Sequence, residues 1–83
     1  MRTWDRLSAT FVRGIKKAGR YYDGGGLLLE ATATKTKGVV NKSWTFRYQL
    51  DHRERFMGGG SARVVSLAMA RAWANEQRKL LAA

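Results

Sequence analysis

Cysteine and proline are both missing from this 83-residue sequence, and histidine occurs once, as His52. Without cysteine, neither disulfides nor thiolate metal sites can form, which is compatible with a reducing cytosol. A lone histidine gives little support to nucleophilic or metal-assisted catalysis. No stretch approaches the roughly 20 apolar residues of a membrane-spanning helix, and residues 1–19 lack the continuous apolar run of a signal peptide.

Acidic residues are also scarce. Six Asp and Glu face 16 Lys and Arg, which gives a formal net charge of +10 at pH 7. A small domain this basic is expected to bind a polyanion, with nucleic acid as the first candidate and an anionic membrane surface as the second. A chain of this length forms one domain at most, because it can bury only about 60–65% of its unfolded surface.

The clearest pattern lies at residues 43–50, Ser-Trp-Thr-Phe-Arg-Tyr-Gln-Leu, where polar and apolar residues alternate strictly. This period of two predicts a strand with one apolar and one hydrogen-bonding face. Residues 27–33 are predicted to form a strand before it. After a two-residue turn at Asp51-His52, residues 53–57 are predicted to return as a third strand.

A two-residue turn also sets the register of the last two strands. The predicted pairs, first on the apolar face and then on the polar face, are Leu50 with Arg53, Tyr48 with Arg55, Phe46 with Met57, Gln49 with Glu54, and Arg47 with Phe56. The glycine-rich segments at residues 21–26 and 58–65 are predicted to be a turn and a connection, and residues 34–42 a long hairpin loop.

Helical spacing occurs toward both ends of the chain. Within residues 1–20, Trp4, Leu7, Phe11 and Ile15 fall at helical spacing. In the region 7–20, Ser8 is the predicted N-cap of a short helix over residues 9–17. Ser66 is the predicted N-cap of a second helix, within residues 66–82. The buried side of that helix is predicted to carry Leu67, Ala70, Trp73, Ala74, Leu80 and Leu81, and its wet side Arg71, Asn75, Arg78 and Lys79.

The predicted fold is α+β, formed by residues 1–83 as a single domain. A three-stranded antiparallel β-meander at residues 27–57 packs on the C-terminal helix, and a short N-terminal helix precedes the sheet. One helix covers only one face of such a sheet, so the other face is expected to stay open.

The open face is predicted to bind DNA through Thr45, Arg47 and Gln49. A sheet or ribbon of this width fits the major groove, where arginine and glutamine read guanine and adenine. Flanking phosphates would be held by five basic residues in or beside the hairpin loops, namely Lys35, Lys37, Lys42, Arg53 and Arg55. Arg47 has an alternative role, a cross-strand ion pair with Glu30 or Glu54. A second set of basic residues consists of Arg13, Lys16, Lys17 and Arg20. These residues form either an arm that contacts phosphates or a solvated helix face.

Five short motifs resemble one known family in their order and spacing. They are LSATFVR at residues 7–13, GRYYDGGGL at 19–27, KSWTFRY at 42–48, MGGGS at 57–61 and VSLAMAR at 65–71. The family is the N-terminal arm-type DNA-binding domain of phage-related tyrosine recombinases, or integrases. The resemblance covers nearly the whole chain from Leu7. It implies that the open face binds double-stranded DNA at arm-type sites, in site-specific recombination.

The resemblance also implies a fragment without catalysis of its own, because the catalytic residues of this family lie in later domains. It implies no cofactor, metal, membrane or small-molecule partner, and a place at the bacterial nucleoid in the cytoplasm. Other integrase protomers or an accessory DNA-bending factor are further expected partners. The sequence departs from the family at the hairpin turn, where Asp51-His52 replaces the common Asn-Gly.

Two other functions stay open. A protein-interaction module that docks a recombinase partner or an accessory factor would be supported by exposed Leu28 and Phe56 on the sheet face. An RNA-binding sheet would need aromatic residues on the open face, whereas Trp44, Phe46 and Tyr48 are predicted on the buried one. The sequence His-x-x-Arg at residues 52–55 also occurs in recombinase active sites, but here it crosses a hairpin turn, and we interpret it as coincidence.

Overall fold

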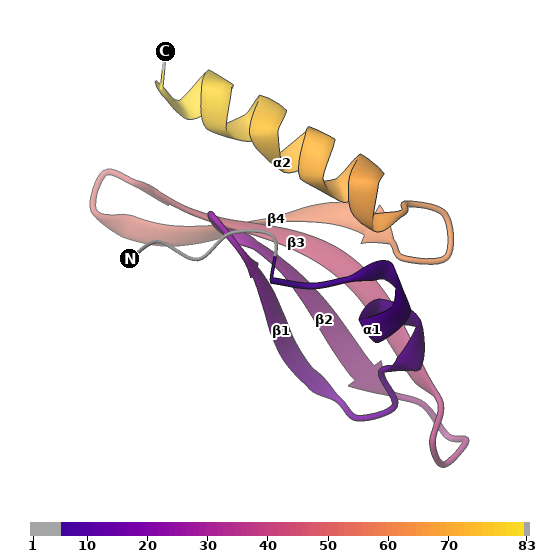
Figure 1. Ribbon diagram of the computed structural model, residues 1–83. Helices are drawn as coiled ribbons and strands as arrows, with labels where there is room; N and C mark the ends of the chain where they lie inside the picture. Colours follow the sequence, from indigo (N-terminus) through magenta and orange to yellow (C-terminus); the bar gives the residue numbers. More distant parts are fainter. Residues whose placement is uncertain (1–5, 83) are drawn as a thin grey trace.

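The computed structural model describes residues 6–82 (Figure 1), so Trp4, one of the four residues at helical spacing near the N-terminus, lies outside the described residues. The elements are, in chain order, α1 (Ala9–Gly14), β1 (Gly19–Gly24), β2 (Leu27–Ala33), β3 (Val40–Leu50), β4 (Arg53–Ser61) and α2 (Leu67–Ala82). The strands form one antiparallel sheet in the order β1-β2-β3-β4. The predicted α+β class, antiparallel sheet and C-terminal helix are confirmed, but the sheet has four strands instead of three.

The strand missing from the prediction is β1. Residues 21–26 were expected to form a turn, yet Tyr21 and Tyr22 pair with Leu29 and Leu28 of β2, and only Gly25-Gly26 makes the turn. A bulge between Tyr22 and Gly24 interrupts the pairing at Asp23, whose side chain is buried. A polar edge strand therefore occupies the segment that composition alone marked as a turn.

The hairpin of β3 and β4 has the predicted register, from Leu50 opposite Arg53 to Phe46 opposite Met57. Asp51 and His52 have φ values of +53° and +65°, which are the left-handed values that a type I′ turn requires. β4 continues to Ser61, beyond its predicted end at Met57. β4 contains a bulge, because Gly58 pairs with Thr45 and Gly60 pairs with Trp44, so Gly59 between them has no partner on β3.

Gly59 is required for packing as well as for the bulge. A Cβ atom on Gly59 would lie 2.5 Å from Cζ3 of Trp73, a residue of α2. Because real Cβ atoms do not approach aromatic carbons that closely, the bare backbone is what lets the tryptophan ring rest on β4.

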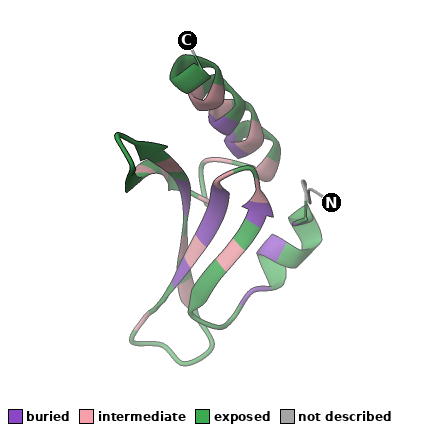
Figure 2. Cartoon of the chain, turned by 90° about the vertical axis from the view of Figure 1, so that its left-hand side faces the viewer, coloured by how far each residue is buried: buried purple, intermediate pink, exposed green. Residues whose placement is uncertain are grey.

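Both helices pack on the same face of the sheet, and the core lies between these layers (Figures 1 and 2). Its largest fully buried members on this face are Trp44, Leu27 and Leu29, and the Trp44 indole N–H donates to the Val65 carbonyl over 2.8 Å. α2 adds Ala70 and Ala74, and the N-terminal part adds Leu7, Val12 and Ile15. The strong twist of the sheet is visible in Figure 2, where the β3–β4 hairpin turns away from the remaining strands.

Both predicted serine caps are confirmed. The Ser8 hydroxyl accepts the Phe11 amide at 3.1 Å, and the Ser66 hydroxyl accepts the Met69 amide at 3.2 Å. α1 is shorter than predicted, because it ends at Gly14 instead of residue 17.

α2 differs from its predicted orientation in two respects. Arg71 and Arg78, predicted on the wet side, are half-buried and turn toward the sheet, where Arg78 donates to the Gly25 carbonyl at 2.8 Å. Leu80 and Leu81, predicted on the buried side, are exposed. The side of α2 that faces the sheet carries the buried and half-buried residues 67, 70, 71, 73, 74, 77 and 78, which include both arginines. The C-terminal end of α2 diverges from the sheet, which leaves the last leucines uncovered (Figure 1).

Candidate nucleic-acid interface

The sheet face opposite the helices carries side chains from all four strands, and we call it the outer face. Strand alternation and register place on it Arg20, Tyr22, Leu28, Glu30, Thr45, Arg47, Gln49, Glu54 and Phe56. Three residues of the predicted DNA site, Thr45, Arg47 and Gln49, thus lie side by side along β3. Arg20 and Tyr22 were not anticipated on this face, because β1 was missed. Two runs separated by Gly25-Gly26 are a hairpin signal that could have revealed them.

The centre of the outer face is a small second core. Leu28 is 0% exposed and Thr45, its neighbour on β3, is 8% exposed. Two aromatic residues share this face, Tyr22 opposite Leu28 at 40% exposure and Phe56 opposite Arg47 at 45% exposure. Thr45, predicted to face a DNA partner, is therefore covered in the free protein.

Each of these two aromatic rings is in contact with the guanidinium group of an arginine. The Arg47 guanidinium carbon lies 5.6 Å from the ring centroid of Tyr22, and that of Arg20 lies 5.3 Å from the centroid of Phe56. Arg20 and Phe56 belong to β1 and β4, the two edge strands. A contact between edge strands requires the outer face to be concave, so that side chains from both edges can meet.

Arg47 also forms the cross-strand ion pair that was the alternative to DNA reading. Its guanidinium lies 3.9 Å from a carboxylate oxygen of Glu54, and both side chains are about half exposed. Exposed pairs at this separation contribute only about 0.2–1 kcal/mol, so a stronger hydrogen-bonding partner can displace Glu54. The ion pair therefore positions Arg47 on the outer face but leaves its guanidinium able to exchange Glu54 for another hydrogen-bonding partner.

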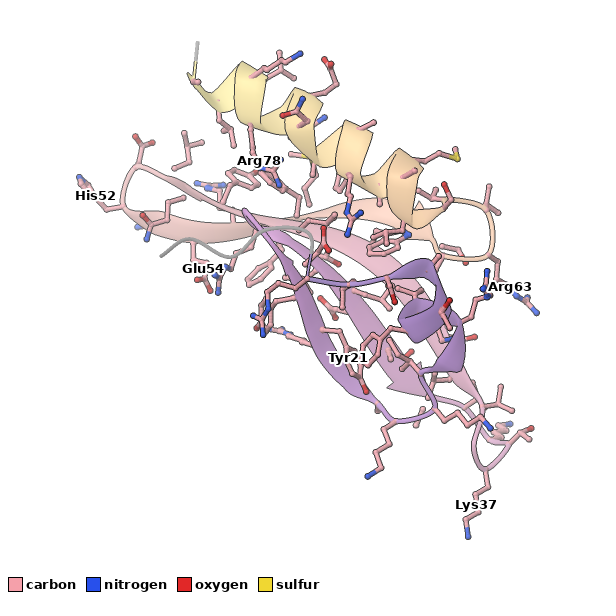
Figure 3. All side chains as sticks on the ribbon, in the orientation of Figure 1. Tyr21, Lys37, His52, Glu54, Arg63 and Arg78 are labelled. Carbon is pink, nitrogen blue, oxygen red and sulfur yellow. The ribbon has the colours of Figure 1, made fainter. Side chains whose placement is uncertain are left out.

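The predicted phosphate contacts do not all lie beside the outer face. Lys35 and Lys37 are exposed in the loop at residues 34–39. This loop forms one end of the molecule, and the Lys37 side chain projects outward from it (Figure 3). Arg53 and Arg55 are exposed on the hairpin, but their pairing with Leu50 and Tyr48 places them on the helix side of the sheet.

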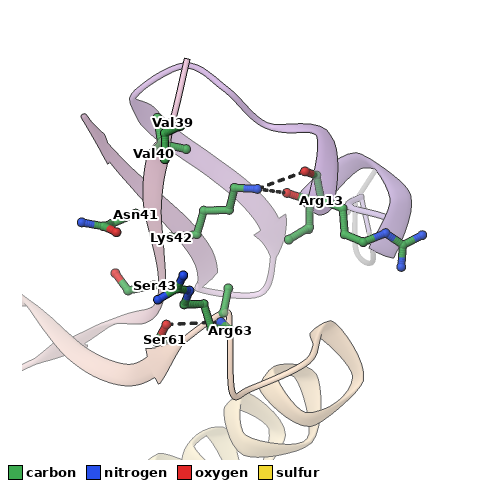
Figure 4. Close-up of a pocket in the computed structure, with 10 residues that line it drawn as sticks. Arg13, Val39, Val40, Asn41, Lys42, Ser43, Ser61 and Arg63 are labelled. Carbon is green, nitrogen blue, oxygen red and sulfur yellow. Dashed lines mark hydrogen bonds between the residues drawn. The ribbon is translucent and has the colours of Figure 1, made fainter. Parts of the chain in front are cut away.

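Lys42 has a structural contact of its own. Its ammonium group donates to the carbonyls of Val12 at 2.7 Å and Arg13 at 3.2 Å, where it caps the end of α1 (Figure 4). Strand alternation also puts Lys42 on the helix side, next to a groove of about 500 Å³ between α1 and the end of β4. Arg13 and Arg63 line the same groove.

Asp23 holds three distant segments together behind the outer face. Its carboxylate accepts the Leu7 amide at 2.9 Å and both Nε and a terminal nitrogen of Arg71 at 2.9 Å, and Arg71 also donates to the Leu7 carbonyl at 2.8 Å. Burial by itself would raise the pKa of Asp23. The hydrogen bonds from Arg71 and Leu7 and the charges of Arg71 and Arg78 outweigh burial, so the pKa lies below its ordinary value.

Among residues 6–82, no three His, Cys, Asp or Glu side chains gather in a way that could hold a metal ion. In the same part of the chain, neither helix is both long enough and apolar enough to span a membrane.

Comparison with known families identifies the type of domain. A family model described as "Arm DNA-binding domain" matches residues 7–83. The chain belongs to the arm DNA-binding domain family. This confirms the resemblance carried by the five motifs, and the family occurs in phage integrases. An arm DNA-binding domain has DNA as its partner and is not itself catalytic. No curated protein matched the chain.

Proposed function

We propose that this arm DNA-binding domain binds double-stranded DNA sequence-specifically, with its outer face in the major groove. The main support for the proposal is Arg47, whose half-exposed side chain on the outer face makes a weak ion pair with Glu54 and a cation–π contact with Tyr22. Arginine pairs with guanine through two hydrogen bonds, and exposed Gln49 on the same strand can pair likewise with adenine.

Affinity and specificity come from different residues in this proposal. The outer face carries two arginines and two glutamates, so its own charges balance. The net attraction for phosphate comes mainly from Lys35 and Lys37 in the loop at one end, because Arg53 and Arg55 lie on the helix side of the hairpin.

Two residues of the predicted site have other roles in this proposal. Lys42 caps α1 and faces the helix side. Thr45 is the cross-strand partner of Leu28 and is only 8% exposed, so little of its side chain is open to a base. Base reading therefore rests on Arg47 and Gln49.

Membership of the family supports a proposed biological setting. The domain would be the N-terminal part of a tyrosine recombinase from a phage or a genomic island and would bind arm-type attachment sites during integration. Later domains would perform catalysis, and other protomers or an accessory DNA-bending factor would share the assembled complex. A docking module for a protein partner is less well supported, because Leu28 is fully buried and no exposed pair of Leu28 and Phe56 exists.

The test is selection of duplexes from a random pool, followed by titration of the best duplex and a scrambled copy at several salt concentrations. Arg47→Ala should weaken the selected duplex by about 1–3 kcal/mol and leave the scrambled one nearly unchanged. Lys37→Ala should weaken both equally and lower the salt slope by about 0.9. Lys79→Ala, an exposed cation on α2, is the matched control and should change neither slope nor preference.

Two results would refute the proposal. Selection that enriches no sequence would show that the domain does not discriminate among duplexes. Equal losses on selected and scrambled DNA for Arg47→Ala would show that Arg47 contributes charge only.

A further inference from the structure

We propose that the outer face also reads thymine, through the rings of Tyr22 and Phe56, and this inference rests on the proposed function of that face. Leu28 and Thr45 at the centre of this face are buried, whereas Tyr22 and Phe56 on the neighbouring strands are 40% and 45% exposed. The rings are thus the outermost apolar surface at the centre of a face whose charges balance.

The major groove offers one apolar feature to such a surface. The C5-methyl group of thymine projects from the base edge, and the other three bases present hydrogen-bonding atoms there. An apolar ring in contact with this methyl removes it from water. Removal of one buried methyl group is expected to weaken binding about fourfold.

The two cation–π contacts favour a methyl contact over base stacking. A guanidinium lies over each ring, Arg47 over Tyr22 and Arg20 over Phe56. One face of each ring is therefore already covered, and a base stacked on a ring would compete with that arginine. Contact through the remaining exposed part of the ring suits a small group such as a methyl.

Strand register adds a constraint on the DNA sequence. Phe56 is the direct cross-strand partner of Arg47. Side chains in such a pair have Cβ atoms about 5 Å apart, which is one to two base-pair steps along a duplex. A thymine read by Phe56 should therefore lie within about two base pairs of the guanine that Arg47 reads.

The test replaces each thymine of the selected duplex, one at a time, by deoxyuridine. This change deletes only the methyl group and keeps Watson–Crick pairing. The 83-residue chain should bind about fourfold more weakly when a thymine within about two base pairs of an essential guanine is replaced. In Phe56→Ala, the ratio of the affinities for the thymine duplex and the deoxyuridine duplex should fall to about one.

Two further variants keep the result interpretable. Phe56→Leu retains an apolar side chain in case the alanine variant unfolds, and it should keep part of the discrimination. Phe11→Ala removes an exposed aromatic residue on α1, away from the outer face, and should discriminate as the unmodified chain does. Tryptophan fluorescence establishes that each variant is folded.

Several outcomes would overturn the inference. Equal affinity for thymine and deoxyuridine duplexes at every position would refute it, yet the proposed function would stand if Arg47→Ala still lost specificity. Unchanged discrimination in Phe56→Ala and in Tyr22→Ala would assign methyl reading to other residues. Tighter binding to single-stranded DNA or RNA, lost in Phe56→Ala, would show that the rings stack on bases instead. Failure of Arg47→Ala to alter preference would refute the proposed function itself.

Discussion

The junction around Asp23 predicts a large loss of stability in Asp23→Asn. Asparagine preserves the shape of the side chain but removes its charge, and it accepts hydrogen bonds through one oxygen only. The carboxylate now accepts three N–H groups, one from Leu7 and two from Arg71. In the variant, the amide N–H₂ of asparagine or the guanidinium of Arg71 loses a partner.

The magnitude follows from the burial of the two partners. Removal of one member of a buried ion pair costs about 3–5 kcal/mol. The Asp23 side chain is 3% exposed but that of Arg71 is 33% exposed, so water can partly solvate the guanidinium left behind. We therefore expect a loss of about 2–3 kcal/mol. A domain of this size has about 4–12 kcal/mol of stability in total, so the loss is a substantial part of it.

Urea unfolding, followed by the fluorescence of buried Trp44, measures this loss. Glu76→Gln is the matched control, because it breaks an ion pair with Lys79 in which both side chains are 67% exposed. That change should cost less than about 0.5 kcal/mol. The double variant of Asp23→Asn with Arg71→Met should lose about 1–3 kcal/mol less than the two single losses together.

The pH dependence has a definite direction. The pKa of Asp23 is lower in the folded chain than the ordinary value of about 3.9. Its contribution to stability is therefore complete above roughly pH 5 and is lost as the pH falls below about 4, through the folded pKa. The difference between the unmodified chain and Asp23→Asn should shrink over the same range. A loss no larger than that of Glu76→Gln, or strict additivity in the double variant, would refute this account of the junction.

Two backbone positions give further predictions. Gly59→Ala should lower the free energy of unfolding by about 1–3 kcal/mol, because its Cβ would collide with Trp73. Gly58→Ala is the control, because a Cβ atom on Gly58 would have no atom within 4 Å. Similar melting temperatures for the Gly59→Ala and Gly58→Ala variants would contradict this explanation. His52→Gly should stabilise the hairpin by about 0.5–1 kcal/mol, since φ of His52 is +65°. That gain corresponds to a rise of roughly 2–8 °C in Tm, and an unchanged Tm would show that the turn carries no strain.

Local signals predicted the hairpin of β3 and β4 and both helix starts. The alternation in residues 43–50 and the two-residue turn define strand faces and register without reference to the rest of the chain. Ser8 and Ser66 cap the helices through hydrogen bonds to amides three residues away. Features that depend on neighbours this close are readable from sequence.

Non-local partners explain the features that were missed. Tyr-Tyr-Asp-Gly has the composition of a turn, and it forms β1 because Leu28 and Leu29 of β2 are available to pair with it. Charged residues are ordinarily assigned to the solvent side of a helix. Arg71 is directed inward by a buried carboxylate 48 residues earlier in the chain, and neither residue would lie there without the other.

The outer face shows the same division. The sequence by itself determined that Thr45, Arg47 and Gln49 share one side of a strand, because side chains alternate with a period of two. It also determined the excess of positive charge. Only the tertiary structure decided that this side has an apolar centre, because a fourth strand adds the Tyr22 ring and the concave sheet brings Arg20 of one edge over Phe56 of the other. Contacts between edge strands depend on strand order and on twist accumulated across the whole sheet, which no local pattern encodes.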